Sequence, residues 1–211
     1  MKVEPVTGWV RAALALFAIG ICQASTADEP WRLARDTDGI KVYTRSVVNS
    51  RLREFRGEVE LAARVEQVVQ VLRDANSFRK WMPDVVDSEM LTAAAEEQYH
   101  YVESAAPWPV ANRDGIYHYR IVRSDDAGSA VTILYIEAVP DYLPRRSGKV
   151  RVPRSDGFWK IVTTGNGVIV TYQMHADPGG SIPSWLANRA VVDIPLRTLK
   201  NLRTYVADLP P

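Results

Sequence analysis

Several residue types that stabilise folds or build catalytic sites are scarce in this chain of 211 residues. Cys22 is the single cysteine, so no disulfide can form within the chain and the fold must be held by its core. The histidines, His100, His118 and His175, lie on different predicted strands without the paired spacing of a metal site, so we expect no bound metal. With 26 basic and 25 acidic residues there is no basic excess, which disfavours a nucleic-acid partner.

Short motifs of common catalytic and nucleotide-binding sites are also missing from the sequence. It contains no G-x-S-x-G nucleophile turn, no G-x-x-x-x-G-K-[ST] phosphate loop and no G-x-G-x-x-G fingerprint. Asp125 and Asp126 are adjacent in a predicted turn, where carboxylates are normally solvated. We therefore expect no cofactor.

The N-terminal residues 1–27 are predicted to be a cleaved signal peptide. Early positive charge precedes the uncharged apolar run 12–22, which is too short to span a bilayer as a helix, and small residues follow up to Ala27. Lipidation of Cys22 is the alternative, disfavoured because a large isoleucine precedes that cysteine. Cleavage after Ala27 leaves one domain, residues 28–211, exported to a bacterial periplasm.

Apolar periodicity predicts a protein made mostly of strands, with one long helix at its end. Strands are predicted at 40–47, 52–61, 85–92, 97–104, 113–123, 130–138, 149–163 in two pieces, and 168–176. Helices are predicted at 28–35, 64–74, 77–84 and 182–206. This order favours an α+β fold in which a curved antiparallel sheet wraps around the long C-terminal helix.

The last predicted hairpin shows which side chains face that helix. Asn166-Gly167 is a strong two-residue turn signal, and as the loop it pairs Ile161 with Tyr172 and Trp159 with Met174. One face of this hairpin is then large and apolar and the other polar, as a half-buried sheet requires.

The long helix carries an apolar stripe at helical spacing, formed by Trp185, Val192, Leu196, Leu199, Leu202 and Val206. Pro195 lies inside it and should bend it, because its ring clashes with the preceding turn and it lacks an N–H.

Three segments together resemble the START lipid-transfer family. They are "PWPVANRD" (residues 107–114), "DPGGSIPSWLAN" (177–188) and "WRLARDTDGIKVYTR" (31–45). The resemblance extends over essentially all of residues 30–207. It implies a helix-grip fold, in which the sheet grips the last helix around a tunnel that holds one lipid, without cofactor or turnover.

The resemblance also assigns residues to this tunnel. Its lining is predicted to comprise His100, Val102, Tyr117, Tyr119, Leu134, Trp159, Ile161, Tyr172, Met174, Trp185, Val192, Leu196 and Leu199. In sterol-binding relatives an acidic residue and an arginine form a charged floor of the tunnel, at the positions of His100 and Tyr119 here. This chain lacks that floor, so sterol is a less favoured ligand. His100 and Tyr119 could bind a hydroxyl or head group, or form a satisfied buried pair.

The loop before the central strand is predicted to be the gate. Its members are Pro107, Trp108, Pro109 and Val110. In ceramide-transferring relatives the matching tryptophan enters the bilayer, and an indole suits that interface; the alternative is that Trp108 plugs the tunnel. Structural roles are predicted for Arg113, Asp114, Gly179, Gly180 and Pro195, with the two glycines and the proline allowing the helix entry to move.

Three hypotheses about function follow. The first is a non-catalytic lipid carrier, monomeric, with a lipid ligand and transient membrane contact. The second is a helix-grip enzyme, cyclase-like or hydrolase-like, in which His100 and Tyr119 act as acid–base groups on a hydrophobic substrate. The third is a lipid-sensing module that acts through a protein partner.

Overall fold

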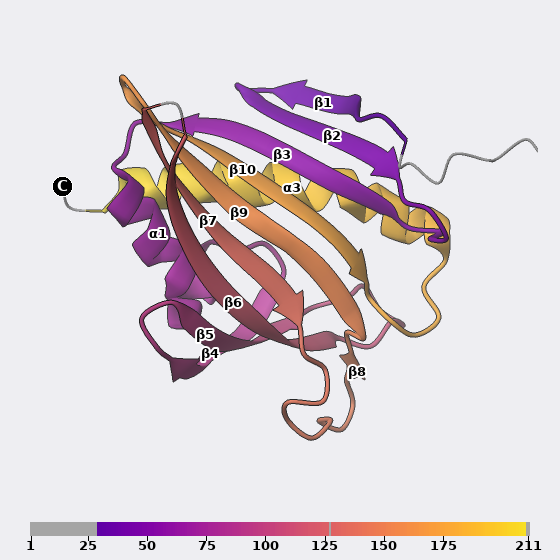
Figure 1. Ribbon diagram of the computed structural model, residues 1–211. Coiled ribbons are helices and arrows are strands. Elements are labelled where there is room, and N and C mark those ends of the chain that lie inside the picture. The colour runs from indigo at the N-terminus through magenta and orange to yellow at the C-terminus, as the bar shows by residue number, and fades with distance from the viewer. Residues whose placement is uncertain (1–28, 127, 210–211) are drawn as a thin grey trace, which may run out of the picture.

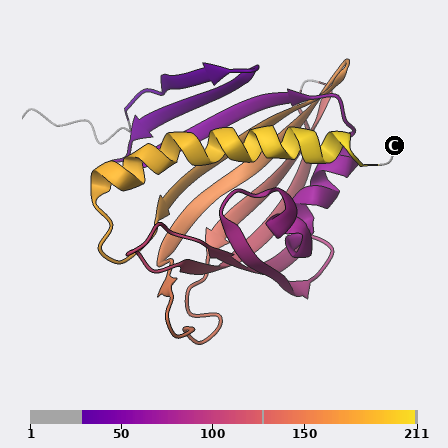
Figure 2. The same cartoon turned by 180° about the vertical axis from the view of Figure 1, so that it is seen from behind.

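The structure is a computed structural model, which describes residues 29–126 and 128–209. The predicted signal peptide, with Cys22, lies outside these residues. A single curved sheet of ten strands has the order β1-β2-β3-β10-β9-β7-β6-β5-β4, with β8 paired to β6 (Figure 1). Helix α3 lies across the concave face of this sheet, and α1 covers the end where α3 finishes (Figure 2). The predicted α+β helix-grip architecture is confirmed.

The bounds of the elements follow the predicted order closely. The strands are β1 Arg32–Thr37, β2 Ile40–Ser46, β3 Arg53–Leu61, β4 Val85–Ala93, β5 Glu97–Ser104, β6 Arg113–Asp126, β7 Ser129–Ala138, β8 Val150–Arg151, β9 Arg154–Thr164 and β10 Gly167–Asp177. The helices are α1 Val65–Arg73, η1 Ala75–Ser77, α2 Phe78–Trp81 and α3 Ser184–Ala207.

The helix predicted at residues 28–35 is wrong, because β1 occupies Arg32–Thr37 as an edge strand. It pairs with β2 through a two-residue turn, Asp38-Gly39, in which both residues have positive φ (53° and 72°). Asp-Gly is a strong hairpin signal in its own right. Before the strand, the guanidinium groups of Arg45 and Arg56 lie over the ring of Trp31, 4.6 and 4.9 Å from its centre.

The register predicted for the last hairpin is displaced by two residues. The turn is Gly165-Asn166, so Tyr172 pairs with Trp159 and Val170 with Ile161. A displacement of two preserves which face each side chain occupies, because successive strand residues alternate between faces. The predicted inward set is therefore correct although every predicted partner is wrong.

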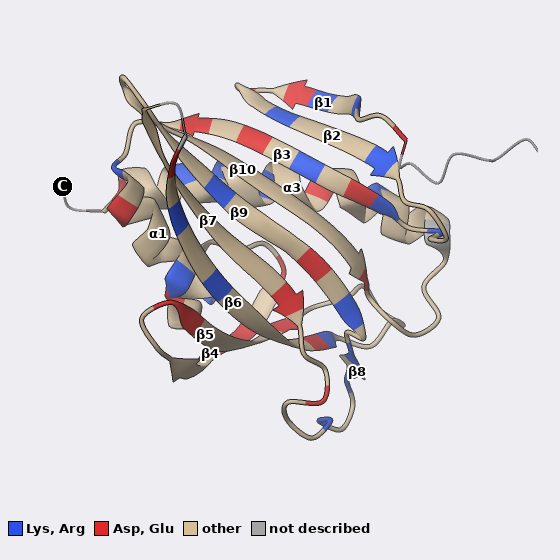
Figure 3. Cartoon of the chain, viewed as in Figure 1, with Lys and Arg blue, Asp and Glu red and all other residues tan. Residues whose placement is uncertain are grey.

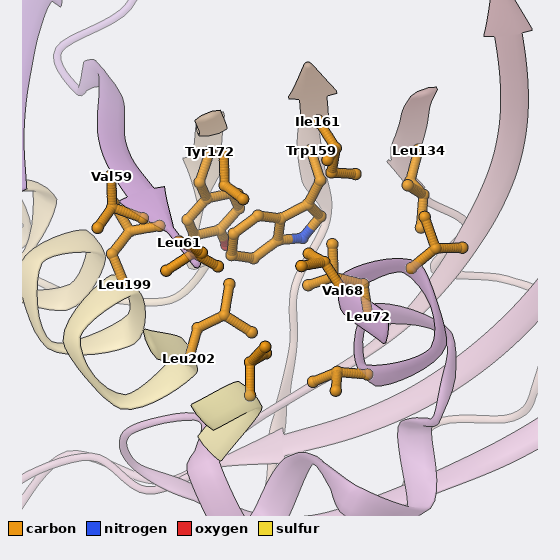
Figure 4. Close-up of a cluster of buried hydrophobic side chains, with 14 of the residues drawn as sticks. Val59, Leu61, Val68, Leu72, Leu134, Trp159, Ile161, Tyr172, Leu199 and Leu202 are labelled. Carbon is orange, nitrogen blue, oxygen red and sulfur yellow. The ribbon is translucent and has the colours of Figure 1, made fainter. Parts of the chain in front are cut away.

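The centre of the concave face is tightly packed. The rings of Trp159 and Tyr172 stack with their centroids 3.8 Å apart. The close-up shows the side chains that surround this pair (Figure 4): Leu199 and Leu202 from α3, and Val68 and Leu72 from α1. Trp159, Leu199 and Leu202 are each at most 1 % exposed. The sheet and helix interlock here without a space for a ligand.

Helix α3 is packed unequally along its length, and it continues through Pro195 without interruption. Its fully buried residues all lie from the middle of the helix onward: Pro195, Thr198, Leu199, Leu202 and Val206. In the described stretch 185–194, none is fully buried. The second half approaches β3 closely because Gly57 has no side chain: a Cβ there would lie 2.6 Å from Leu199 Cδ1.

Charges of both signs are interleaved along the strands on the convex face (Figure 3). Across residues 29–126 and 128–209, the structure contains no helix both long and apolar enough to cross a membrane.

Replacing Gly57 with alanine should destabilise the protein by about 1–3 kcal/mol, because the added methyl group overpacks the contact with Leu199. Urea unfolding curves measure this change. Gly165→Ala is the matched control, since its Cβ would meet nothing within 4 Å, and it should change stability by less than about 0.5 kcal/mol. Equal effects of the two substitutions would contradict the close-approach explanation.

Candidate functional site

A cavity of about 410 Å³ lies under the first half of α3. The sheet contributes Phe55 and Met174, the helix contributes Leu186 and Ile194, and the loop between β5 and β6 closes one side. This lining is mostly apolar, and its volume falls in the range of small-molecule sites. It occupies the stretch of the helix that has no fully buried residue.

Polar contacts connect α3 to the segments that border the cavity. Asn188 Oδ1 accepts a hydrogen bond from the backbone N–H of Arg53 at 3.0 Å. On the other side of the cavity, the Arg197 guanidinium forms an ion pair with the Asp84 carboxylate. These contacts connect the helix to its neighbours at the rim of the cavity, where Val191 and Val192 pack partly buried against the core.

The loop that closes the cavity places its tryptophan outside. Pro107 and Val110 line the cavity, whereas Trp108 is 92 % exposed. In this structure the indole therefore does not plug the cavity, and the alternative of an inward-folded lid is not the arrangement found. Val110 donates its backbone N–H to the Pro107 carbonyl, which turns the chain tightly around Trp108 and the following Pro109.

The end of this loop is anchored by the Arg-Asp pair. Asp114 accepts hydrogen bonds from Arg151 at 3.1 and 2.9 Å, and both side chains are 1 % exposed. The neighbouring Arg113 guanidinium donates to the carbonyls of Ala111 and Gly179. Arg113 thus ties the gate loop to the segment that leads into α3.

That segment depends on two glycines. Gly179 and Gly180 both have φ of +68°, a region that other residues rarely adopt. They carry the chain from the end of β10 around the cavity mouth to the first turn of α3.

The structure distributes the predicted tunnel residues between the cavity and the packed core. Met174 lines the cavity. Val102, Tyr117, Val192 and Leu196 are partly buried. The packed core takes His100, Tyr119, Leu134, Trp159, Ile161, Tyr172 and Leu199.

Trp185 does not match its predicted place in the tunnel. Its side chain is 70 % exposed, because the first turn of α3 turns this face outward. Like Trp108, Trp185 is an exposed indole whose neighbour in the chain, Leu186, lines the cavity. The helical stripe could not show this, since it records which residues share a face and not where the sheet ends.

Several residues that line the cavity are not among those predicted from the sequence. Phe55 and Arg53 face it from β3, and Leu186, Ala190 and Ile194 face it from α3. Strand alternation would have placed Arg53 on the inward face, but a charged residue gave no reason to assign it there.

A larger cleft of about 940 Å³ lies between α1 and the strand ends, where α3 finishes. Arg64, Arg73, Thr163 and Thr164 are among its lining residues. This lining is more polar than that of the cavity under α3 and less suited to an apolar ligand.

The His100–Tyr119 pair lies in the core and is electrically neutral near pH 7. The two rings stack 4.1 Å apart, and His100 Nε2 lies 3.2 Å from the side-chain amide of Gln98. Burial, followed by the charge of Arg73, lowers the pKa of His100 to about 3. Burial also raises the pKa of Tyr119 well above its usual value, as do the neighbouring phenols of Tyr172 and Tyr117.

Such shifts remove both residues from acid–base chemistry at neutral pH. An efficient general acid or base has a pKa near the working pH. Here His100 is too weak a base and Tyr119 too weak an acid. The geometry fits a stacked structural pair, and the observation disfavours the enzymatic alternative built on these residues.

Acidification should destabilise the protein through His100. The unfolded chain binds a proton at this residue near pH 6.5, whereas the folded protein does so only near pH 3, so stability falls as pH drops between these values. The loss is on the order of 4 kcal/mol. Denaturant titrations at a series of pH values measure it.

His100→Phe should flatten this dependence, whereas His175→Gln, at a histidine on β10, should retain it. An unchanged slope in His100→Phe would show that His100 is not the group responsible.

Comparisons with known proteins agree with this architecture. A family model described as "START domain" matches residues 15–207. An uncharacterized protein of Pseudomonas aeruginosa is 38% identical over 192 residues, which cover 90% of this chain and 93% of that protein. Phosphatidylcholine transfer protein of Rattus norvegicus is 27% identical over 165 residues, covering 76% of each chain.

A solved structure is more similar still. The crystal structure of a STAR-related lipid transfer protein fragment from Xanthomonas axonopodis is 58% identical and superposes with a TM-score of 0.81. It covers 85% of this chain and 100% of that one.

Proposed function

The chain belongs to the START domain family, and from that premise we propose that it binds one lipid in the cavity under α3 and carries it between membranes without altering it. The observation that carries this proposal is the mostly apolar cavity of about 410 Å³ under α3, with polar contacts at its rim. The names of the rat and Xanthomonas axonopodis relatives, which are lipid transfer proteins, support it.

The energetics favour a carrier for such a ligand. Burying one CH₂ group is worth about 0.8 kcal/mol, so an acyl chain of about 14 carbons gains on the order of 11 kcal/mol in a dry cavity. A lipid held this tightly leaves only when an equally apolar environment is offered. Release therefore requires the cavity mouth to open against a bilayer.

Two exposed indoles support membrane contact at the mouth. Trp108 is 92 % exposed between Pro107 and Val110, which line the cavity. Trp185 is 70 % exposed beside Leu186, which also lines it. Tryptophan favours the membrane–water interface, where its apolar body and polar N–H are both accommodated.

The gate and the helix entry are proposed to move together. Arg113 donates hydrogen bonds to both segments, to Ala111 in the loop and to Gly179 before α3. Displacement of one segment by a membrane therefore loosens the other.

The N-terminal sequence supports export to a bacterial periplasm, where the protein would act as a monomer.

The proposal is tested by loading the protein with lipid. Delipidated protein is incubated with vesicles made from a bacterial lipid extract, re-isolated and examined by native mass spectrometry. We expect one lipid per chain with its covalent structure unchanged. Failure to acquire any hydrophobic molecule would end the carrier proposal, and a chemically altered ligand would favour catalysis.

Trp108→Ala and Trp185→Ala should each reduce vesicle-to-vesicle transfer several-fold, because each removes an interfacial anchor. Stability should stay within about 0.5 kcal/mol, since both side chains are largely exposed. Tyr135→Ala is the control, because it removes an exposed aromatic ring from β7, away from the cavity lining. Transfer that is reduced equally in all variants would argue against docking through the mouth.

A further inference from the structure

An arginine lies in a row of core residues at the mouth of the cavity. On β3 the inward positions are 53, 55, 57, 59 and 61, and at the last four the residues are buried. Arg53 occupies the first of these positions, where the strand reaches the cavity, and its side chain is half-buried in the lining. A cation on the concave face is unexpected for a site that holds only hydrocarbon.

The other charges around the cavity neutralise each other. Its lining contains Arg53, Arg189, Arg197, Asp84 and Asp193. Arg197 pairs with Asp84, and Arg189 lies 3.6 Å from Asp193. Among the described residues, the guanidinium of Arg53 has no ion-pair partner, and its contact with Asn188 uses only the backbone N–H. One unmatched positive charge therefore remains in the lining.

The size of the cavity limits how much lipid it takes. At about 30 Å³ per small group, as for water in the liquid, 410 Å³ holds about 14 non-hydrogen groups. An acyl chain of about 14 carbons matches this number, whereas a lipid with two such chains has about twice as many chain groups. The cavity does not extend further along the helix, because Leu199 meets Gly57 and Trp159 stacks on Tyr172 beyond it.

We infer that the ligand is a single-chain amphiphile with an anionic head group, a carboxylate or a phosphate. Its head binds the Arg53 guanidinium at the mouth, and its chain lies along Phe55, Met174, Leu186 and Ile194. Guanidinium donors match both oxyanions in a bidentate arrangement. This inference rests on the proposed carrier function and names its substrate class.

The test compares four ligands in calorimetric titrations. Myristate and lysophosphatidate with the same chain are anionic, and monomyristin is the neutral single-chain ligand. The fourth ligand is two-chain phosphatidylcholine, supplied in micelles of a short-chain lipid. Wild-type protein should bind at least one of the two anionic ligands at least tenfold more tightly than monomyristin. The stronger of the two identifies the head group as carboxylate or phosphate. Phosphatidylcholine should bind more weakly than either.

Arg53→Gln should lower affinity for the preferred anionic ligand at least tenfold and leave monomyristin within twofold. Arg56→Gln is the matched control, since it makes the same change on the same strand but on the convex face, and it should bind all ligands as wild type does. Circular dichroism checks that both variants fold.

Two results would overturn the inference while leaving the carrier function standing: an equal loss for charged and neutral ligands in Arg53→Gln, or tighter binding of two-chain phosphatidylcholine than of myristate. If no hydrophobic ligand of any kind binds, the carrier function itself fails.

Discussion

The close approach of α3 to β3 at Gly57 sets the arrangement of the whole concave face. Because this glycine has no side chain, Leu199 reaches the strand and fixes the second half of the helix in the core. Before Pro195 none of the described helix residues is fully buried, and the hydrogen bond of Asn188 to the Arg53 backbone connects the helix to β3. The cavity lies under this less buried stretch, so the position of α3 accounts for both the packed core at one end and the cavity at the other.

The polar contacts around the cavity differ in strength according to their burial. Asp114 and Arg151 form a pair excluded from water, which also fixes the chain after β7 through the carbonyls of Pro140, Leu143 and Pro144. Removing one partner of such a pair is costly. The contacts at the rim are partly exposed and individually weak. A buried ion pair at the base of the loop and weaker contacts at the cavity mouth are consistent with the opening at one end that we propose.

The same geometry explains why His100 and Tyr119 are poorly suited to acid–base chemistry near neutral pH. His100 and Tyr119 are outside the cavity lining, in the core where His100 contacts Phe78 of α2, and burial keeps both uncharged near neutral pH. Arg53, by contrast, lies at the mouth and keeps contact with solvent. The charged side chain, Arg53, therefore lies where a head group would remain hydrated. The uncharged pair, His100 and Tyr119, lies in the packed core.

Sequence alone determined the element order from residue 40 onward, the long helix and the inward face of the last hairpin, because these depend on local periodicity of two or 3.6 residues. Even a register error of two residues left Trp159 and Tyr172 on the correct face. Tertiary structure alone decided that Trp159 is core while Phe55 borders the cavity, and that Trp185 is exposed. The physical reason is that periodicity specifies which side chains share a face, whereas whether that face meets a neighbour, a space or solvent depends on residues far away in the chain.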